Sequence, residues 1–148
     1  MRFQSVTFDL DGTLLDTVPD LAEASNRMLA ELGSPLRSED EIRSFVGRGI
    51  VVLVGRCLDR GAAPDEALLA RAVEVFKRHY AAVNGNETRI FAGVLAGLEA
   101  WRATRVPLAV LTNKPAAFTE PLLERMGLKH YFSAIVSGDS TPFRKPHP

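Results

Sequence analysis

Three short apolar runs, each ending in polar residues, constrain the possible fold of this chain more than any other feature of its sequence. They are "FQSVTFDL" at 3–10, "VPLAVLTN" at 106–113 and "SAIVSGD" at 133–139. Their β-branched and aromatic residues, and the turn-forming residues around them, are typical of strands. Helical patterns at 93–105 and 115–127 separate them. Strands that alternate with helices predict an α/β fold with a Rossmann-like parallel sheet.

A long insert with helical periodicity follows the first run. Residues from about 18 to 84 repeat apolar side chains at helical spacing. Pro19 suits the first turn of a helix, and Gly33 suits the position just past its end. Ser38 and Glu41 have the spacing of a capping box, which predicts the start of another helix.

This insert is too long for a plain crossover between parallel strands, so we expect it to form a domain of its own. The segment "NGNE" at 84–87 is the clearest linker. We therefore predict a discontinuous sheet domain, residues 1–17 and 88–148, and an inserted helical domain, residues 18–87.

Composition narrows the classes of function. The 148 residues carry 18 Lys and Arg and 18 Asp and Glu, and no basic cluster, so nucleic acid is not an expected partner. Cys57 is the single cysteine, which rules out an internal disulfide and favours a reducing compartment. The N-terminus lacks a signal-peptide pattern, and no apolar stretch approaches the roughly 20 residues of a membrane span. We expect a cytoplasmic protein, whose oligomeric state the sequence does not indicate.

Polar residues follow all three predicted strands. Asp9 and Asp11 come at the end of the first, Thr112 and Asn113 at the end of the second, and residues 138–145 after the third. Ligands of open parallel sheets bind beyond the carboxyl ends of the strands. We therefore expect these residues to converge in space.

The two neighbouring acids, Asp9 and Asp11, indicate which chemistry the site performs. Asp9 and Asp11 point to the same side of an extended chain, where two carboxylates repel and need a cation or a shared proton. Carboxylates with water are a usual Mg²⁺ environment. The Lys145 amine and the Thr112 hydroxyl suit phosphate oxygens. These residues predict a magnesium-dependent phosphate site, where one carboxylate attacks phosphorus and the other moves the proton.

Three motifs in order resemble those of the haloacid dehalogenase superfamily. They are "DLDGTLLDT" at 9–17, "VLTN" at 110–113 and "RKPHP" at 144–148. The insert resembles the helical cap of that superfamily. Segments in the cap and after the second motif look closer still to bacterial phosphatases that act on 2-phosphoglycolate.

The resemblance implies a role for each motif residue. Asp9 would be the nucleophile and a Mg²⁺ ligand. Asp11 would be the general acid and then the base, and its backbone carbonyl would also bind the metal. Thr112 and the backbone of Asn113 would hold the phosphoryl oxygens, and Lys145 would offset their negative charge.

The resemblance also implies the substrate class. An acid at Asp11 indicates a phosphatase, since the halide released by a dehalogenase needs no proton. A cap that closes over the site excludes large substrates and bulk water. The expected substrate is a small phosphorylated metabolite, 2-phosphoglycolate in particular. Thr13 is a further candidate contact. Arg48 stands in the glycine-flanked "VGRG" and could reach a substrate carboxylate when the cap closes.

Each assignment has a structural alternative. The Asp11–Gly12 pair is also a hairpin signal, and Thr112 suits a helix cap. Lys145 alone resembles a solvated surface lysine, and Arg48 an exposed loop arginine. Cys57 lies on an apolar helical face and is expected in the core. The histidines lack metal-ligand spacing and are expected to be structural: His79, His130 and His147.

One motif of the superfamily is missing. Its fourth, acidic motif completes the metal site, yet only three residues follow Lys145. Asp139 precedes that lysine and is a poor substitute. We therefore expect a C-terminally truncated piece with an incomplete Mg²⁺ site and a bare edge on its first strand. Two alternatives stay open: a non-catalytic binding module, and a phosphomutase or phosphonate hydrolase of the same superfamily.

Overall fold

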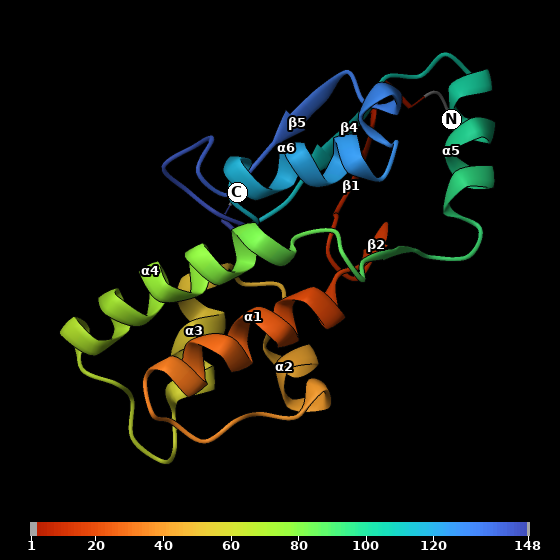
Figure 1. Cartoon of the computed structure of the whole chain (residues 1–148). Helices are drawn as coiled ribbons and strands as arrows, with labels where there is room; N and C mark the ends of the chain where they lie inside the picture. Colours follow the sequence, from red (N-terminus) through yellow and green to blue (C-terminus); the bar gives the residue numbers. More distant parts are fainter. Residues whose placement is uncertain (1–2, 148) are drawn as a thin grey trace. The chain divides into compact units, whose positions relative to one another are not determined.

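A computed structural model describes residues 3–147 of the chain. It divides into two compact units, one formed by Met1–Asp16 with Arg89–Pro148 and the other by Thr17–Thr88. Figure 1 shows the elements of both. In the described part, no helix combines the length and the apolar character needed to cross a membrane.

The first unit contains a parallel sheet of three strands. β1 (Val6–Phe8), β4 (Leu108–Leu111) and β5 (Ala134–Val136) lie in the order β1-β4-β5 (Figure 1). The predicted α/β fold with a parallel sheet is therefore confirmed. The strands are shorter than the apolar runs that predicted them. Among the described residues, β1 and β5 are the edge strands of this sheet.

Helices and a small ribbon complete this unit. They are α5 (Val94–Ala103), α6 (Ala116–Arg125), and the antiparallel pair β2 (Leu15–Asp16) and β3 (Arg89–Ile90). A short 3₁₀ helix covers Lys129–Tyr131. The ribbon was not predicted, because two residues are too few to show an alternating pattern.

Aliphatic side chains from the sheet and its helices form one core. Leu98 of α5 and Leu122 of α6 are both almost fully buried against the strands. Burying such a side chain contributes about 1.5–3 kcal/mol. The cluster consists of Leu10, Leu14, Leu15, Leu98, Leu108, Val110, Leu122, Leu123 and Leu128. Leu10 belongs to it and precedes Asp11, so the core anchors the first acidic loop.

The second unit is helical. It comprises α1 (Val18–Glu31), α2 (Glu39–Phe45), α3 (Ile50–Leu58) and α4 (Glu66–Val83). Its largest buried side chains include Phe76 and Tyr80, which stack with ring centroids 5.5 Å apart. Cys57 is fully buried, as expected, and burial raises the pKa of its thiol.

The predicted capping box at the start of α2 is present. The Glu41 amide donates to the Ser38 hydroxyl at 3.2 Å, and the Ser38 amide donates to the Glu41 carboxylate at 2.8 Å. The Ser38 amide and the Arg37 guanidinium lower the pKa of Glu41. The stabilisation from this carboxylate is therefore present at neutral pH and is lost as the pH falls through that lowered pKa.

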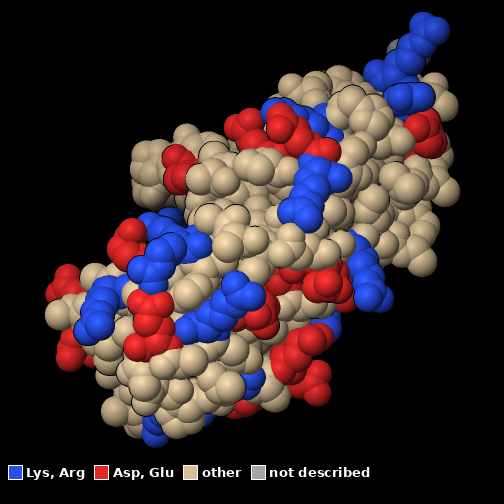
Figure 2. Space-filling view, viewed as in Figure 1, with Lys and Arg blue, Asp and Glu red and all other residues tan. Residues whose placement is uncertain are grey.

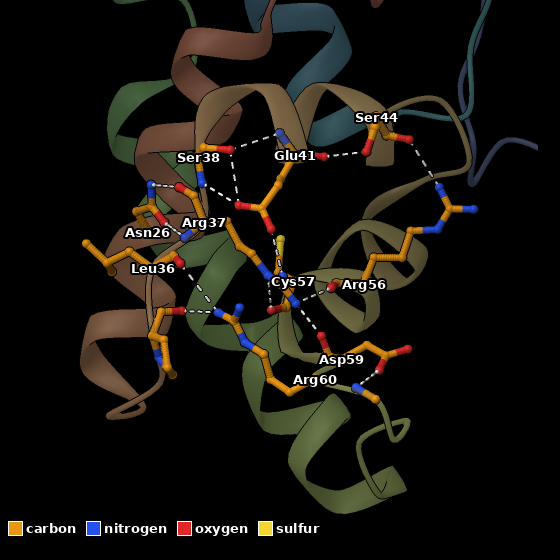
Figure 3. A network of polar contacts seen from close by, with 12 residues as sticks. Asn26, Leu36, Arg37, Ser38, Glu41, Ser44, Arg56, Cys57, Asp59 and Arg60 are labelled. Atoms are coloured by element: carbon orange, nitrogen blue, oxygen red, sulfur yellow. Dashed lines mark hydrogen bonds and ion pairs between the residues drawn. The ribbon is translucent and has the colours of Figure 1, made fainter.

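Arg37 links the loop before α2 to the end of α3 (Figure 3). Its guanidinium donates to the carbonyls of Cys57, Arg56 and Asp59, and it pairs with Glu41 at 2.8 Å. These carbonyls belong to the last turn of α3 and to its C-cap residue, where intrahelical donors run out. A single arginine thus satisfies the end of α3 and fixes the preceding loop.

Charged side chains of both signs are mixed over the face drawn in Figure 2. This mixture agrees with the equal numbers of basic and acidic residues in the sequence, 18 of each.

Asp20 organises the segment in which the chain leaves α4. It lies in the first turn of α1, is 1% exposed, and accepts hydrogen bonds from the amides of Gly85, Glu87 and Thr88. The Thr88 hydroxyl also donates to it, at 2.6 Å. A buried carboxylate is stable only with such a set of donors.

We expect Asp20→Ala to lower the free energy of unfolding by about 3 kcal/mol, since it leaves several buried donors without an acceptor. Chemical denaturation measures this change. Asp40→Ala is the matched control, because Asp40 is an exposed acid in the first turn of α2, and it should cost less than about 1 kcal/mol. Equal effects of both substitutions would contradict the role of Asp20.

Candidate active site

The site residues lie where the three parallel strands end. Phe8, Val110 and Ile135 are in register across the sheet. The carboxyl ends of the strands therefore meet at one edge. The loops that leave this edge contain the polar residues predicted to form the site.

The first loop is a compact turn around Leu10. Its buried carbonyl accepts hydrogen bonds from the amides of Thr13, Leu14 and Leu15. Gly12 has φ +78°, a conformation that side chains disfavour. The alternative of a simple hairpin is wrong, because β1 pairs in parallel with β4.

Asp9 forms an ion pair with Lys145. The Lys145 Nζ lies 2.8 Å from Asp9 Oδ1 and donates to the Leu111 carbonyl at 2.7 Å. The side chains of Asp9 and Lys145 are 41% and 29% exposed. The Leu10 amide donates to the same Asp9 oxygen at 2.8 Å. Asp9 is thus oriented while remaining accessible.

Asp11 forms a separate and more buried pair. Lys114 Nζ lies 3.0 Å from Asp11 Oδ1, and the exposed fractions are 3% for the lysine side chain and 14% for the aspartate. The two carboxylates are therefore each neutralised by their own lysine. The Lys114 contact was not predicted.

Asn113 holds the loop that contains Lys145. Its side-chain oxygen accepts from the Lys145 amide at 3.0 Å, and its side-chain nitrogen donates to the Lys145 carbonyl at 3.2 Å. This two-point contact joins residues 32 positions apart and fixes the lysine backbone. The prediction assigned only the Asn113 backbone, so this use of the side chain is an addition.

Thr112 is 3% exposed and continues the sheet, because its amide donates to the Val136 carbonyl at 3.0 Å. Its hydroxyl accepts from the Lys114 amide at 3.1 Å. It does not cap α6, whose N-cap residue is Pro115. The alternative of a helix cap is therefore wrong.

Gly138 makes the closest backbone approach in the site. Its amide donates to the Lys114 carbonyl at 2.9 Å. A Cβ at this position would lie 2.6 Å from the Asn113 carbonyl carbon and closer still to its oxygen. Only glycine fits here, which ties the third loop to the second.

Asp139 caps the start of the neighbouring helix, α6. Its carboxylate accepts from the Ala116 amide at 2.9 Å, at the start of α6. This is a capping contact, which satisfies a donor that the helix itself leaves unpaired. Among the described residues, no group of three or more His, Cys, Asp or Glu is arranged to hold a metal ion.

The two predicted substrate contacts belong to different units. Thr13 is exposed in the turn after Asp11. Arg48 is exposed in the loop between α2 and α3, in the other unit. Their roles stay predictions.

Each histidine side chain has an ion-pair or aromatic partner. His79 pairs with Glu31 at 2.8 Å, and the rings of His130 and His147 pack on Tyr131 and Phe143. This agrees with the structural roles expected for them.

The sequence did offer a signal for Lys114. The residue directly follows the polar end of a buried strand, where a lysine without room to reach solvent requires an acidic partner. Pairing it with Asp11 needed the sheet order, because 103 positions separate the two residues.

Comparisons with known proteins show which proteins this chain is similar to. The family model of haloacid dehalogenase-like hydrolases matches residues 6–148. The chain is 46% identical over 150 residues to a phosphoglycolate phosphatase of Thiobacillus denitrificans, and 48% identical over 150 residues to one of Nitrosospira multiformis. Each match covers 100% of this chain and 66% of the relative. The chain thus spans about two thirds of the length of these curated relatives.

A solved structure shares the fold of this chain. The crystal structure of a protein from Haemophilus somnus, described as a predicted phosphoglycolate phosphatase, superposes with a TM-score of 0.91 at 35% identity. The match covers 99% of this chain and 67% of the other.

We expect Gly138→Ala to lower the free energy of unfolding by about 1–3 kcal/mol, because the added methyl group displaces the Asn113 backbone. Gly97→Ala is the matched control: Gly97 lies in α5 with nothing within 4 Å of an added Cβ. In a helix that change stabilises by about 0.5–1 kcal/mol. Thermal denaturation of both variants measures the difference, and a stable Gly138→Ala protein would contradict the close approach.

Proposed function

Because this chain belongs to the haloacid dehalogenase-like hydrolase family, we propose that it is a magnesium-dependent phosphatase of small phosphorylated metabolites. The proposed substrate is 2-phosphoglycolate, which gives glycolate and phosphate. The observation that carries this proposal is the pair of carboxylates, each neutralised by its own lysine, at the carboxyl edge of the sheet. The names of the relatives at 46% and 48% identity support the choice of substrate.

Asp9 is the proposed nucleophile. Its side chain is the more exposed of the two acids, and the contacts from the Leu10 amide and Lys145 orient it. A carboxylate oxygen attacks phosphorus, the bond to the leaving oxygen breaks, and an aspartyl-phosphate forms. Lys145 offsets the negative charge that the nucleophile and the phosphoryl group bring together.

Asp11 is the proposed proton donor and acceptor. It gives a proton to the leaving alkoxide in the first step. In the second step it takes a proton from the water that attacks the aspartyl-phosphate. The water oxygen bonds to phosphorus, the Asp9–phosphorus bond breaks, and inorganic phosphate leaves.

The metal fits the oxygen donors that are present. The Asp9 carboxylate and the Asp11 backbone carbonyl would hold Mg²⁺, which usually takes one or two carboxylates and keeps several waters. When bound, it would neutralise charge on the phosphoryl oxygens. Both residues leave β1 through one compact turn, which fixes their spacing.

Other residues would bind the substrate. Thr112 and the Asn113 backbone would contact phosphoryl oxygens, since both follow β4 at the same edge of the sheet. Thr13 would add a contact from the first loop. Arg48 would bind the substrate carboxylate, a task that suits the two parallel donors of a guanidinium.

We expect Asp9→Asn to reduce phosphate release from 2-phosphoglycolate at least about 10³-fold, because an amide cannot form the covalent intermediate. A phosphate assay with Mg²⁺ measures this loss, and Asp40→Asn, an exposed acid of α2, is the control. Unchanged turnover in the Asp9→Asn protein would show that the nucleophile is wrong. A wild-type protein that hydrolyses aryl phosphates but not 2-phosphoglycolate would overturn the substrate only.

A further inference from the structure

Three hydrogen bonds fix the backbone of Lys114. Its amide donates to the Thr112 hydroxyl at 3.1 Å. Its carbonyl accepts from the Thr119 hydroxyl at 3.1 Å and from the Gly138 amide at 2.9 Å. Contacts from the strand end, from α6 and from the third loop therefore fix the point from which the side chain starts.

The side chain of Lys114 is buried as well. It is 3% exposed and places its ammonium 3.0 Å from Asp11 Oδ1. A buried ion pair is expensive, and apolar residues of similar size usually give equal or better stability. A position used only for packing would not need this lysine. The Asp11 carboxylate meanwhile keeps 14% of its side-chain surface accessible.

The second lysine, Lys145, binds the other acid. Lys145 binds the nucleophile Asp9 and the Leu111 carbonyl, and its side chain is 29% exposed. The two acids are thus held by ammonium groups from different loops. This separation allows one lysine to serve the attack on phosphorus and the other to serve proton transfer.

We propose that Lys114 is a positioning residue that holds the Asp11 carboxylate as the base for hydrolysis of the aspartyl-phosphate. The proposal rests on the function proposed above and names a residue that the sequence motifs do not include. The ammonium binds the carboxylate form of Asp11, which is the form that takes the proton from water. Lys114 keeps its own proton throughout, and Asp11 alone exchanges one.

This role has a kinetic signature. The first step with a good leaving group, such as p-nitrophenolate, needs no proton from Asp11. The second step needs Asp11 as base whatever the substrate was. Loss of Lys114 therefore slows the second step selectively, and the aspartyl-phosphate accumulates. A merely structural role would lower the amount of active enzyme and leave no such intermediate.

The experiment compares Lys114→Met with the wild-type protein under pre-steady-state conditions, using p-nitrophenyl phosphate and Mg²⁺. We expect a burst of nitrophenolate close to one equivalent, followed by turnover reduced about 10²-fold. Intact-mass measurement after an acid quench should show most of the enzyme phosphorylated. Lys114→Arg should recover part of the steady-state rate, because it retains a cation opposite Asp11.

Lys129→Met is the control, since Lys129 pairs with Glu124 on an exposed surface, and its rates should match the wild type. A Lys114→Met protein that turns over slowly without a burst or phosphoenzyme would overturn the positioning role. So would a Lys114→Arg protein as impaired as Lys114→Met, which also covers the case in which the methionine variant fails to fold. A wild-type protein with no phosphatase activity would instead overturn the proposed function itself.

Discussion

Repulsion between two neighbouring carboxylates is the constraint on which the rest of the site depends. Asp9 and Asp11 leave β1 two residues apart, and each is neutralised by a lysine from a different loop. The order β1-β4-β5 brings those loops to the same edge. Without the parallel sheet the two acids would have no cations opposite them, and the turn around Leu10 would concentrate unbalanced negative charge.

Contacts around the two lysines keep their ammonium groups opposite the two carboxylates. Asn113 fixes the backbone of Lys145, and Gly138 allows the third loop to approach the second closely enough for that contact. The Thr112 hydroxyl holds the amide of Lys114. These groups act on the lysines through the backbone, so they set where the cations lie and leave the carboxylates open to a ligand.

The fold could be predicted from the sequence because the signals of its strands and helices are local. Apolar runs bounded by turns mark the strands, and their alternation with helices implies a parallel sheet. That inference also led to the expectation that Asp9, Thr112 and Lys145 would converge. The capping box of α2 was equally visible, because Ser38 and Glu41 are three residues apart.

The contacts that the sequence did not predict join residues that are distant in sequence. The Lys114–Asp11 pair joins residues 103 positions apart, so only the sheet order brings them together. The Asn113 contact with Lys145 joins two loops that share no local pattern. Asp20 lies in the first turn of α1, where an acid is common, yet it binds the segment after α4. Such partners follow from tertiary packing, which a single sequence does not encode at fixed spacing.

The central claim is that the two acids have different tasks, with Asp9 as nucleophile and Asp11 in proton transfer. Locating the phosphoryl group tests it most directly: the enzyme is quenched in acid during turnover, digested, and its peptides are sequenced by mass spectrometry. Our account predicts phosphorylation of Asp9 alone. A phosphoryl group on Asp11 or on a histidine would contradict the account.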